Sequence, residues 1–236
     1  MTAGKIYLIP TPISDSGLNN VLTDKLIEIL QRLDTFFVEN IRTSRRFLSK
    51  TGIKNIQNIH FEVLDKNADP HQIEGLLNII KDGKNAGIMS EAGCPGIADP
   101  GSKIIILAHK YNIDVIPLTG ASSIFLALMA SGFNGQNFQF HGYLPIDRKD
   151  REKKIINLEK LVYTYHQTQI FMETPYRNNR LLDALLKLLK PDTLLCIASN
   201  LTSSDEFIKT RPVKVWRKQV LDLHKKPTIF LLYMES

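Results

Sequence analysis

Cysteine is scarce in this sequence of 236 residues: Cys94 and Cys196 are its two cysteines, and they lie far apart along the chain. Because they form no Cys-x-x-Cys pair, neither a zinc site nor a disulfide framework is expected. We therefore predict that both residues stay as thiols in a reducing compartment, and that the protein holds no metal.

Long apolar runs are also missing. No segment approaches the roughly 18 apolar residues that a membrane-spanning helix needs, and the N-terminal residues lack the charged-then-apolar pattern of a secretion signal. These absences predict a cytoplasmic protein that does not enter a membrane. The 30 basic and 24 acidic residues leave a formal net charge of +6. This surplus fits an anionic partner such as RNA without establishing one.

Short apolar segments alternate along the chain with segments whose apolar residues recur at helical spacing. The predicted strands are Lys5–Ile9, Thr35–Glu39, Ile59–Val63, Ala86–Met89, Asp114–Leu118, Phe138–Leu144, Gln169–Glu173, Leu194–Ala198 and Thr228–Tyr233. The predicted helices are residues 24–33 (after Thr23 as N-cap), 40–48, 70–80, 103–110, 123–129, 148–165 and 179–189. This alternation predicts an α/β fold with a mainly parallel sheet and helices on both faces. We place a boundary between Pro117 and Leu118, which gives two α/β domains, residues 1–117 and 118–236, with a cleft between them.

The segment from Ser90 to Gly101, after a predicted strand, has an unusual composition. It contains three glycines and two prolines, namely Gly93, Gly96, Gly101, Pro95 and Pro100. Glycine lets a ligand approach the main chain and proline stiffens the backbone, so this loop is typical of one shaped for a ligand. It lacks the spacing of phosphate-binding loops, and Glu91 and Asp99 suit a ribose hydroxyl pair or an ammonium group. The alternative is an ordinary tight connection whose acids face water.

Three arginines of the predicted helix 40–48, Arg42, Arg45 and Arg46, share one helical face. Guanidinium groups suit phosphate, so this face is either a phosphate-binding stripe or an ordinary solvated surface. The small residues between Gly120 and Ser131 leave a similar choice, because they allow either tight helix packing or room for a flat ring.

Seven short motifs, in a fixed order over nearly the whole chain, are similar to those of one enzyme family. They are Tyr7–Ile13 (YLIPTPI), Glu39–Ser44 (ENIRTS), Ser90–Pro95 with Ala98–Gly101 (SEAGCP and ADPG), Pro117–Ser122 (PLTGAS), Ala130–Gly132 (ASG), Phe140–Pro145 (FHGYLP) and Phe171–Arg177 (FMETPYR). As an ordered set they resemble the tetrapyrrole-methylase superfamily of S-adenosylmethionine-dependent methyltransferases. Within it, the chain is most similar to the branch that methylates a cytidine 2'-hydroxyl in small-subunit ribosomal RNA.

This resemblance implies a two-domain α/β enzyme, usually a homodimer, with S-adenosylmethionine in the cleft between the domains. It also implies ribosomal RNA or the small ribosomal subunit as the partner. The cofactor-binding residues that it implies are Pro10, Ser90, Gly93, Asp99, Pro100, Ser122, Ser123, Met172, Ala198 and Pro227. The substrate-binding residues that we expect are Arg42, Arg45, Arg46 and Arg177.

The chain departs from the pattern of that branch at positions expected on the acceptor side. Asn40 stands where the branch has an acid, and Ser199, Asn200 and Ser203 stand where it has charged residues. These changes leave two other functions open. One is the methylation of a tetrapyrrole or another small acceptor on the same scaffold, and the other is cofactor or RNA binding without turnover.

A ribose hydroxyl is a weak nucleophile, and a positioned base can help to remove its proton. The candidates near strand ends are Glu39, His141 and Glu173. Each has a structural alternative: His141 as a hydrogen-bonded strand histidine, and the two glutamates as holders of backbone or arginine groups. The sequence does not choose among them.

Overall fold

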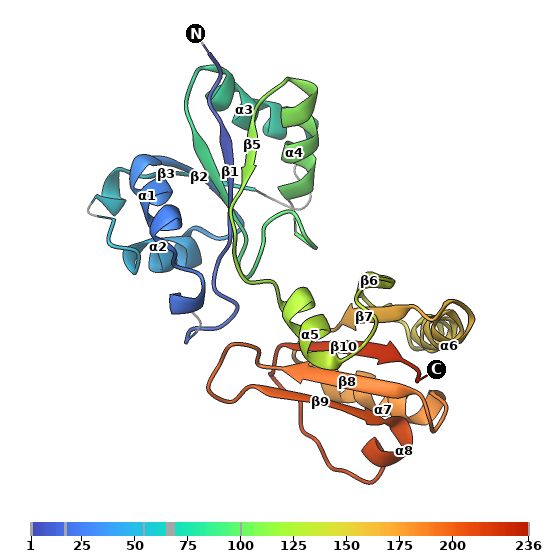
Figure 1. Cartoon of the computed structure of the whole chain (residues 1–236). Helices are drawn as coiled ribbons and strands as arrows, with labels where there is room; N and C mark the ends of the chain where they lie inside the picture. The colour runs from blue at the N-terminus through green and yellow to red at the C-terminus, as the bar shows by residue number, and fades with distance from the viewer. Residues whose placement is uncertain (1, 17, 54, 65–68, 100, 236) are drawn as a thin grey trace. The chain divides into compact units, whose positions relative to one another are not determined.

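The computed structural model describes every residue of the chain except 1, 17, 54, 65–68, 100 and 236. The chain divides into two compact units, Met1–Ser122 and Ser123–Ser236, which Figure 1 colours from blue to green and from light green to red. This division falls a few residues after our predicted boundary between Pro117 and Leu118. Both units combine one sheet with several helices, which confirms the predicted α/β class.

The first unit is built on a five-stranded sheet whose described pairings are all parallel. Its strands, in spatial order, are β3 (His60–Val63), β2 (Thr35–Val38), β4 (Ala86–Met89), β1 (Ile6–Ile9) and β5 (Val115–Pro117). The connecting segments contain α1 (Asp24–Arg32), α2 (Ile41–Ser49), α3 (Pro70–Lys81), α4 (Gly101–Lys110) and the short 3₁₀ helices η1 (Leu18–Asn20) and η2 (Ile56–Asn58). The predicted parallel sheet is therefore confirmed for this unit.

Both faces of this sheet are covered, as the sequence of β2 illustrates. Phe36 and Val38 lie in the core that α1 and α2 form on one face. Phe37, which points the other way because side chains alternate along a strand, lies in the core that α3 and α4 form. All three side chains are fully buried. The carboxyl ends of the parallel strands therefore become the part of the sheet where connecting loops can meet a ligand.

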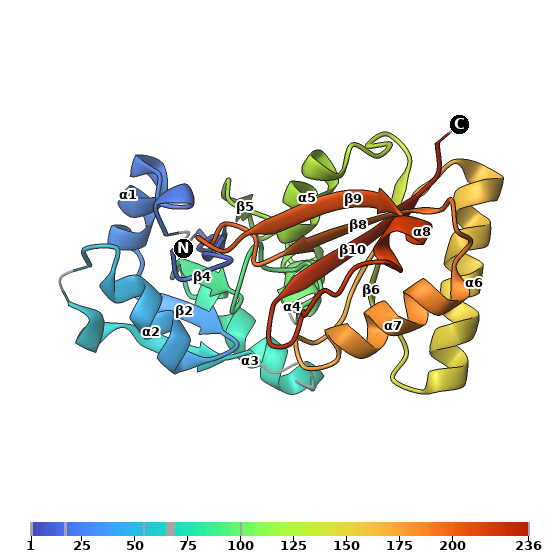
Figure 2. The ribbon, with the colours of Figure 1, turned by 90° about the horizontal axis from the view of Figure 1, so that it is seen from below.

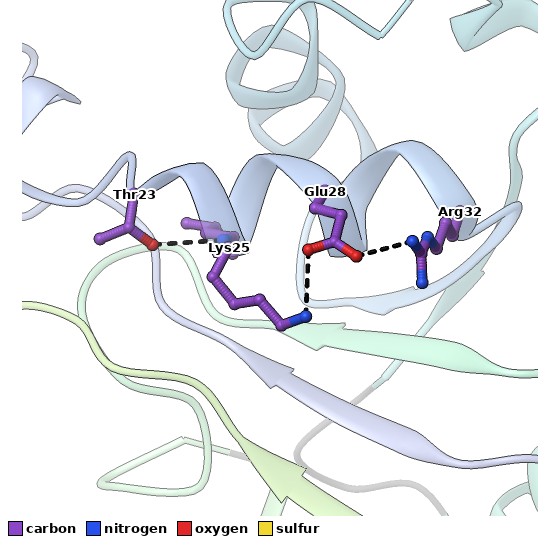
Figure 3. A network of polar contacts seen from close by, with 5 residues as sticks. Thr23, Lys25, Glu28 and Arg32 are labelled. Atoms are coloured by element: carbon purple, nitrogen blue, oxygen red, sulfur yellow. Dashed lines mark hydrogen bonds and ion pairs between the residues drawn. The ribbon is translucent and has the colours of Figure 1, made fainter.

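Helix α1 shows how local sequence sets an element (Figure 3). The Thr23 Oγ1 atom accepts a hydrogen bond from the Leu26 main-chain N–H at 3.2 Å, which confirms the predicted N-cap. Glu28 forms ion pairs with Lys25 at 3.0 Å and Arg32 at 2.6 Å along the exposed face. Such exposed pairs contribute little to stability. The buried Leu26 and Leu30 on the opposite side fix the helix against the sheet.

The second unit has a five-stranded sheet of mixed direction, and here the expectation of a mainly parallel sheet is wrong. Its strands, in spatial order, are β6 (Phe138–Tyr143), β7 (Thr168–Met172), β10 (Thr228–Tyr233), β8 (Leu194–Ser199) and β9 (Phe207–Pro212). Only the β6–β7 pair among the described pairings is parallel. The apolar runs indicated the strands correctly, but an apolar run carries no direction. The last strand, β10, enters between β7 and β8 and runs antiparallel to both.

Strand β9 and the short helix α8 (Val213–Trp216) were not predicted. Strand β9 has two apolar residues at its start, followed by three polar residues and a proline, and it is mostly half-buried, so the segment has no long apolar run. Figure 2 shows β9 beside β8, with β10 on the other side of β8. The strand forms because β8 offers its free edge, which is a tertiary cause.

The core of the second unit lies between its sheet and three helices: α6 (Arg148–Tyr165), α7 (Asn178–Leu188) and α8. The indole of Trp216 is buried there and donates a hydrogen bond from Nε1 to the Leu195 carbonyl oxygen at 2.9 Å. Helix α5 (Ser123–Ser131) packs on the other face of the sheet (Figure 1). Both faces of the central strands are thus covered in this unit as well.

Gly87 provides a test of the packing around the first sheet. A Cβ atom at this position would clash with the side chain of Ile9 and come within 2.9 Å of the Phe36 ring. We expect Gly87→Ala to lower the free energy of unfolding by about 1–3 kcal/mol through overpacking. Chemical denaturation of the purified protein would measure this loss.

Gly75→Ala is the matched control, because a Cβ atom there meets open space on helix α3. Replacing a glycine inside a helix by alanine should raise the stability by about 0.5–1 kcal/mol. If both variants were equally stable, the close packing described for Gly87 would be wrong.

Candidate functional site

The loop Ser90–Gly101 follows β4, the central strand of the first sheet, and is held by the segment that follows β1. The Thr11 N–H donates to the Gly93 carbonyl oxygen at 2.9 Å, and the Gly93 N–H donates back to the Thr11 carbonyl at 3.1 Å. The Thr11 hydroxyl also donates to the Ser90 carbonyl oxygen at 3.2 Å. A small antiparallel bridge therefore fixes the first half of the loop against the chain after β1.

Asp99 closes the second half of the loop. Its Oδ1 atom accepts hydrogen bonds from the Gly96 N–H at 2.6 Å and from the Gly101 N–H at 3.1 Å. Gly96 has a φ of +84° and Ala98 a φ of +65°, so the loop is sharply turned between them. The sequence predicted Asp99 as a cofactor-binding residue, and the structure shows that its Oδ1 atom shapes the loop. Pro100, also in the predicted set, lies outside the described residues.

Two further side chains tie the loop to neighbouring strands. Glu39, directly after β2, accepts the Glu91 N–H at its Oε2 atom at 3.0 Å. The Cys94 thiol donates to the Ala121 carbonyl oxygen at 3.4 Å, in the segment that follows β5. Burial, with a smaller contribution from the Asp99 charge, raises the pKa of Cys94, so the thiol keeps its proton. The loop is thus held from the ends of β1, β2 and β5.

Close packing of main chain surrounds this loop. A Cβ atom on Gly120 would clash with the ring of Pro10, so the segments after β5 and β1 can meet only because residue 120 is glycine. A Cβ atom on Gly93, whose φ is +79°, would lie 3.7 Å from the Ala121 carbonyl oxygen. Ile97, on the same loop, is exposed at 45%. A loop with several glycines and an exposed apolar side chain suits a nucleoside that is recognised through main-chain groups and apolar contact.

The three arginines predicted to form a stripe lie on α2 but have different partners. Arg46 forms an ion pair with Asp15 at 3.0 Å. The Arg45 guanidinium lies over the Phe61 ring, 5.2 Å from its centroid. Among the described residues, the Arg42 side chain makes no hydrogen bond or ion pair. Asn40, where the related branch has an acid, is the N-cap of α2 and accepts from the Arg42 N–H at 2.9 Å.

Three of the predicted cofactor-binding residues of the second unit lie at one end of its sheet, and the fourth, Ser123, begins helix α5. Met172 on β7 and Ala198 on β8 are both register partners of Ile229 on β10, from its two sides. Pro227 lies just before β10, and its carbonyl oxygen accepts the Asn200 N–H at 2.9 Å. Ala198 is fully buried, whereas Met172 is half-buried and Pro227 is exposed. Of these three residues, Met172 and Pro227 are therefore the ones that a ligand could contact through their side chains.

Glu173, a candidate base, directly follows β7 and is bound to its own turn. Its Oε1 atom accepts from the Thr174 N–H at 2.6 Å and from Arg177 Nη2 at 2.6 Å. Its side chain is 1% exposed. The buried Nε of Arg177 has no hydrogen-bond partner among the described residues. This geometry matches the structural alternative for Glu173, in which the carboxylate holds backbone and arginine groups.

His141, the second candidate in this unit, lies on β6, and its Nε2 atom forms a hydrogen bond of 2.7 Å with the Oε1 atom of Gln169 on β7. Burial lowers the pKa of His141, although the bond to Gln169 acts in the opposite direction. The histidine is therefore neutral at pH 7 and forms part of the sheet. This geometry also favours its structural alternative.

Sequence reasoning assigned no role to Thr11, Cys94 or Ala121 in shaping the loop. A signal was present for Thr11: proline has no N–H, so Thr11 offers the one main-chain donor of Pro10-Thr11-Pro12. The bond from Cys94 to Ala121 depends on the meeting of two loops, which no local pattern reveals.

Within the described ranges, no group of three or more His, Cys, Asp or Glu side chains could hold a metal ion. No helix among the same residues has the length and apolar character needed to cross a membrane.

Asp99→Ala tests the role of the loop closure. Because the loop would lose two main-chain hydrogen bonds, we expect the dissociation constant of S-adenosylmethionine to rise by about tenfold or more, with the overall fold intact. Calorimetric titration with the cofactor would measure this change, and circular dichroism would check the fold. Asp99→Asn keeps an oxygen at the same position and is the matched control. Unchanged affinity in Asp99→Ala would contradict the assigned role of the loop.

Comparison with known proteins agrees with the motifs. The family model described as Tetrapyrrole (Corrin/Porphyrin) Methylases matches residues 5–215. The chain is 30% identical over 232 residues to the Ribosomal RNA small subunit methyltransferase I of Buchnera aphidicola subsp. Schizaphis graminum, a match that covers 97% of this chain and 78% of that protein. The protein of the same name from Vibrio cholerae is 29% identical over 208 residues, covering 88% of this chain and 68% of its own length.

Among solved structures, the fold resembles that of the methyltransferase CobJ with a TM-score of 0.64. The sequence identity is 15%, and the match covers 98% of this chain and 95% of that chain, so this likeness concerns the fold. The family match spans both units that were described above. The chain therefore belongs to the tetrapyrrole (corrin/porphyrin) methylases and is an S-adenosylmethionine-dependent methyltransferase.

Proposed function

We propose that this protein methylates ribosomal RNA of the small ribosomal subunit, at the ribose 2'-hydroxyl of a cytidine. The observation that supports methyl transfer best is the glycine-rich loop Ser90–Gly101, which hydrogen bonds hold from the ends of three strands. The RNA acceptor is supported by relatives whose names specify small-subunit ribosomal RNA and that are similar over most of this chain. The assembly that we propose is a cytoplasmic homodimer.

When bound, the cofactor would supply a methyl group that its sulfonium already activates. Its sulfur would be the leaving group as the acceptor oxygen takes the methyl group and gives up its proton. The chain contributes alignment of the two reactants and exclusion of water. We assign the cofactor to main-chain groups of the loop Ser90–Gly101 and to Pro10. Ser122 and Ser123, with Met172, Ala198 and Pro227 of the second unit, complete the proposed set.

This mechanism does not depend on a side-chain base. Glu173 is bonded to Arg177 and the Thr174 N–H, and His141 is bonded to Gln169. These contacts give the Glu173 Oε1 atom and the His141 Nε2 atom structural roles. On the acceptor side we place Arg42, because its guanidinium has no hydrogen bond or ion pair within the part of the chain that the structure describes. Arg177, which the sequence also suggested, is a second candidate, and its side chain is 28% exposed.

The experiment that tests the acceptor is a methylation map of small-subunit ribosomal RNA from cells with and without this gene. Mass spectrometry of nuclease fragments should show one cytidine that loses its 2'-O-methyl group in the deletion strain. Complementation with the unmodified gene should restore it. Identical maps in the two strains would remove the ribosomal acceptor. A labelled methyl group that enters a low-mass fraction would then point to a small acceptor.

Arg42→Ala tests the acceptor side of the proposal. The variant should bind the RNA acceptor less tightly, and the slope of log affinity against log salt should decrease by about 1, because one phosphate contact is lost. Its affinity for S-adenosylmethionine should stay unchanged. Filter binding over a salt series and calorimetry would measure the two effects.

Arg45→Ala is the matched control, because Arg45 lies on the same helix but is held over Phe61. We expect it to change RNA affinity less than Arg42→Ala does. If Arg42→Ala weakened cofactor binding and left RNA binding intact, the assignment of α2 to the acceptor would be wrong.

A further inference from the structure

We propose that Glu39 is a positioning residue, whose carboxylate fixes the start of the loop Ser90–Gly101 for cofactor binding. The distance between its Oε2 atom and the Glu91 main-chain nitrogen is 3.0 Å, and the two residues are 52 positions apart in sequence. The inference deepens the proposed function, because it concerns the same site and rests on that function for its catalytic readout. It replaces the other role considered for Glu39, that of a general base.

The bond continues the pairing of two parallel strands beyond the end of the sheet. Val38 of β2 is the register partner of Met89 of β4, so Glu39 and Ser90 begin the segments that leave the sheet together. In a longer sheet, main-chain carbonyl groups of β2 would accept the next N–H groups of β4. Here the Glu39 carboxylate accepts the Glu91 N–H instead.

The main chain after β2 cannot take this role, because it turns directly into helix α2. Asn40 is the N-cap of that helix, and its side chain accepts from the Arg42 and Thr43 N–H groups. Its carbonyl oxygen already accepts the Ser44 N–H at 3.1 Å and the Thr43 hydroxyl at 3.1 Å. The Glu39 side chain therefore provides an acceptor at the point where the ladder of main-chain bonds ends.

The other ties hold different parts of the loop. Thr11 bonds to Ser90 and Gly93 from the side of β1, Asp99 bonds to Gly96 and Gly101, and Cys94 reaches the segment after β5. The hydrogen bond from Glu39 reaches the loop from the end of β2, the strand that leads into α2 and Arg42. It therefore connects the proposed cofactor loop with the helix that we assign to the acceptor.

Removing the carboxylate should loosen the loop without disturbing the chemical step. In Glu39→Ala, amide hydrogen exchange at Glu91 should become about tenfold faster, and the dissociation constant of S-adenosylmethionine should rise by about the same factor, since a charged acceptor is lost. With ribosomal RNA as acceptor, KM for the cofactor should rise while kcat at saturating cofactor stays within about twofold.

Glu39→Gln distinguishes positioning from base catalysis. The amide oxygen of glutamine can accept the same N–H, so exchange, affinity and KM should return close to the values of the unmodified protein. The dependence of kcat on pH should also be unchanged. A general base would behave differently, because glutamine cannot take a proton. A fall in kcat by about 100-fold or more in Glu39→Gln, with unchanged cofactor affinity, would overturn the proposal.

Glu62→Ala is the control for the loss of a carboxylate from the same sheet. Glu62 lies on β3 and bonds to His60 at 2.8 Å, away from the loop. The Glu62→Ala variant should leave amide hydrogen exchange at Glu91 and the affinity for S-adenosylmethionine unchanged. If Glu39→Ala behaved like this control, Glu39 would not position the loop.

The hydrogen-exchange measurement needs neither cofactor nor acceptor, so it separates this inference from the proposed function. If the unmodified protein bound S-adenosylmethionine but methylated no ribosomal RNA, the acceptor would be wrong, and the exchange and affinity data would still decide the role of Glu39. If the unmodified protein bound no cofactor, the proposed function would fail. The rate of amide exchange at Glu91 would then be the single measurement that decides whether Glu39 fixes the loop.

Discussion

The loop Ser90–Gly101 has few apolar side chains that could fix its shape by packing, so hydrogen bonds to its main chain fix it instead. Its glycines leave little apolar surface to bury and add conformational freedom that folding must remove. Hydrogen bonds from Thr11, Glu39 and Asp99 restrict it instead, and each of them engages main-chain groups of the loop. Because these bonds come from the ends of neighbouring parallel strands and from the loop itself, the sheet below determines where the loop lies. The surface that we assign to the cofactor depends on this arrangement.

The side chains that the sequence suggested as catalytic bases also form hydrogen bonds that hold the structure. Glu173 holds Arg177 and a main-chain N–H, Glu39 holds the start of the loop, and His141 is neutral and bonded within its sheet. A sulfonium methyl donor is already activated, so a methyltransferase of this family accelerates the reaction mainly by aligning donor and acceptor and by excluding water. Carboxylates that set geometry are consistent with such chemistry. The two glutamates thus act on main-chain N–H groups and, for Glu173, on the Arg177 guanidinium.

Much of the first unit could be predicted from the sequence, since each of its buried strands is a short apolar run and each helix has a periodic apolar face. Thr23 was recognised as a cap because N-capping is a local interaction. The second unit was harder to predict. The direction of β10 and the existence of β9 depend on which strand edges are available after the chain has folded back. A half-buried edge strand such as β9 carries no apolar run that would indicate it.

The sequence alone determined the α/β class, the family, and the loop on which the site is built, because glycine and proline spacing and apolar periodicity act over a few residues. Only the tertiary structure decided what the polar residues do. Arg42, Arg45 and Arg46 look equivalent on one helical face, but Asp15 and Phe61 engage two of them from distant parts of the chain. Glu39 looks like a possible base until β2 and β4 bring it to the Glu91 N–H. A side chain's role follows from the partner that it meets, and partners distant in sequence become neighbours only when the strands pair.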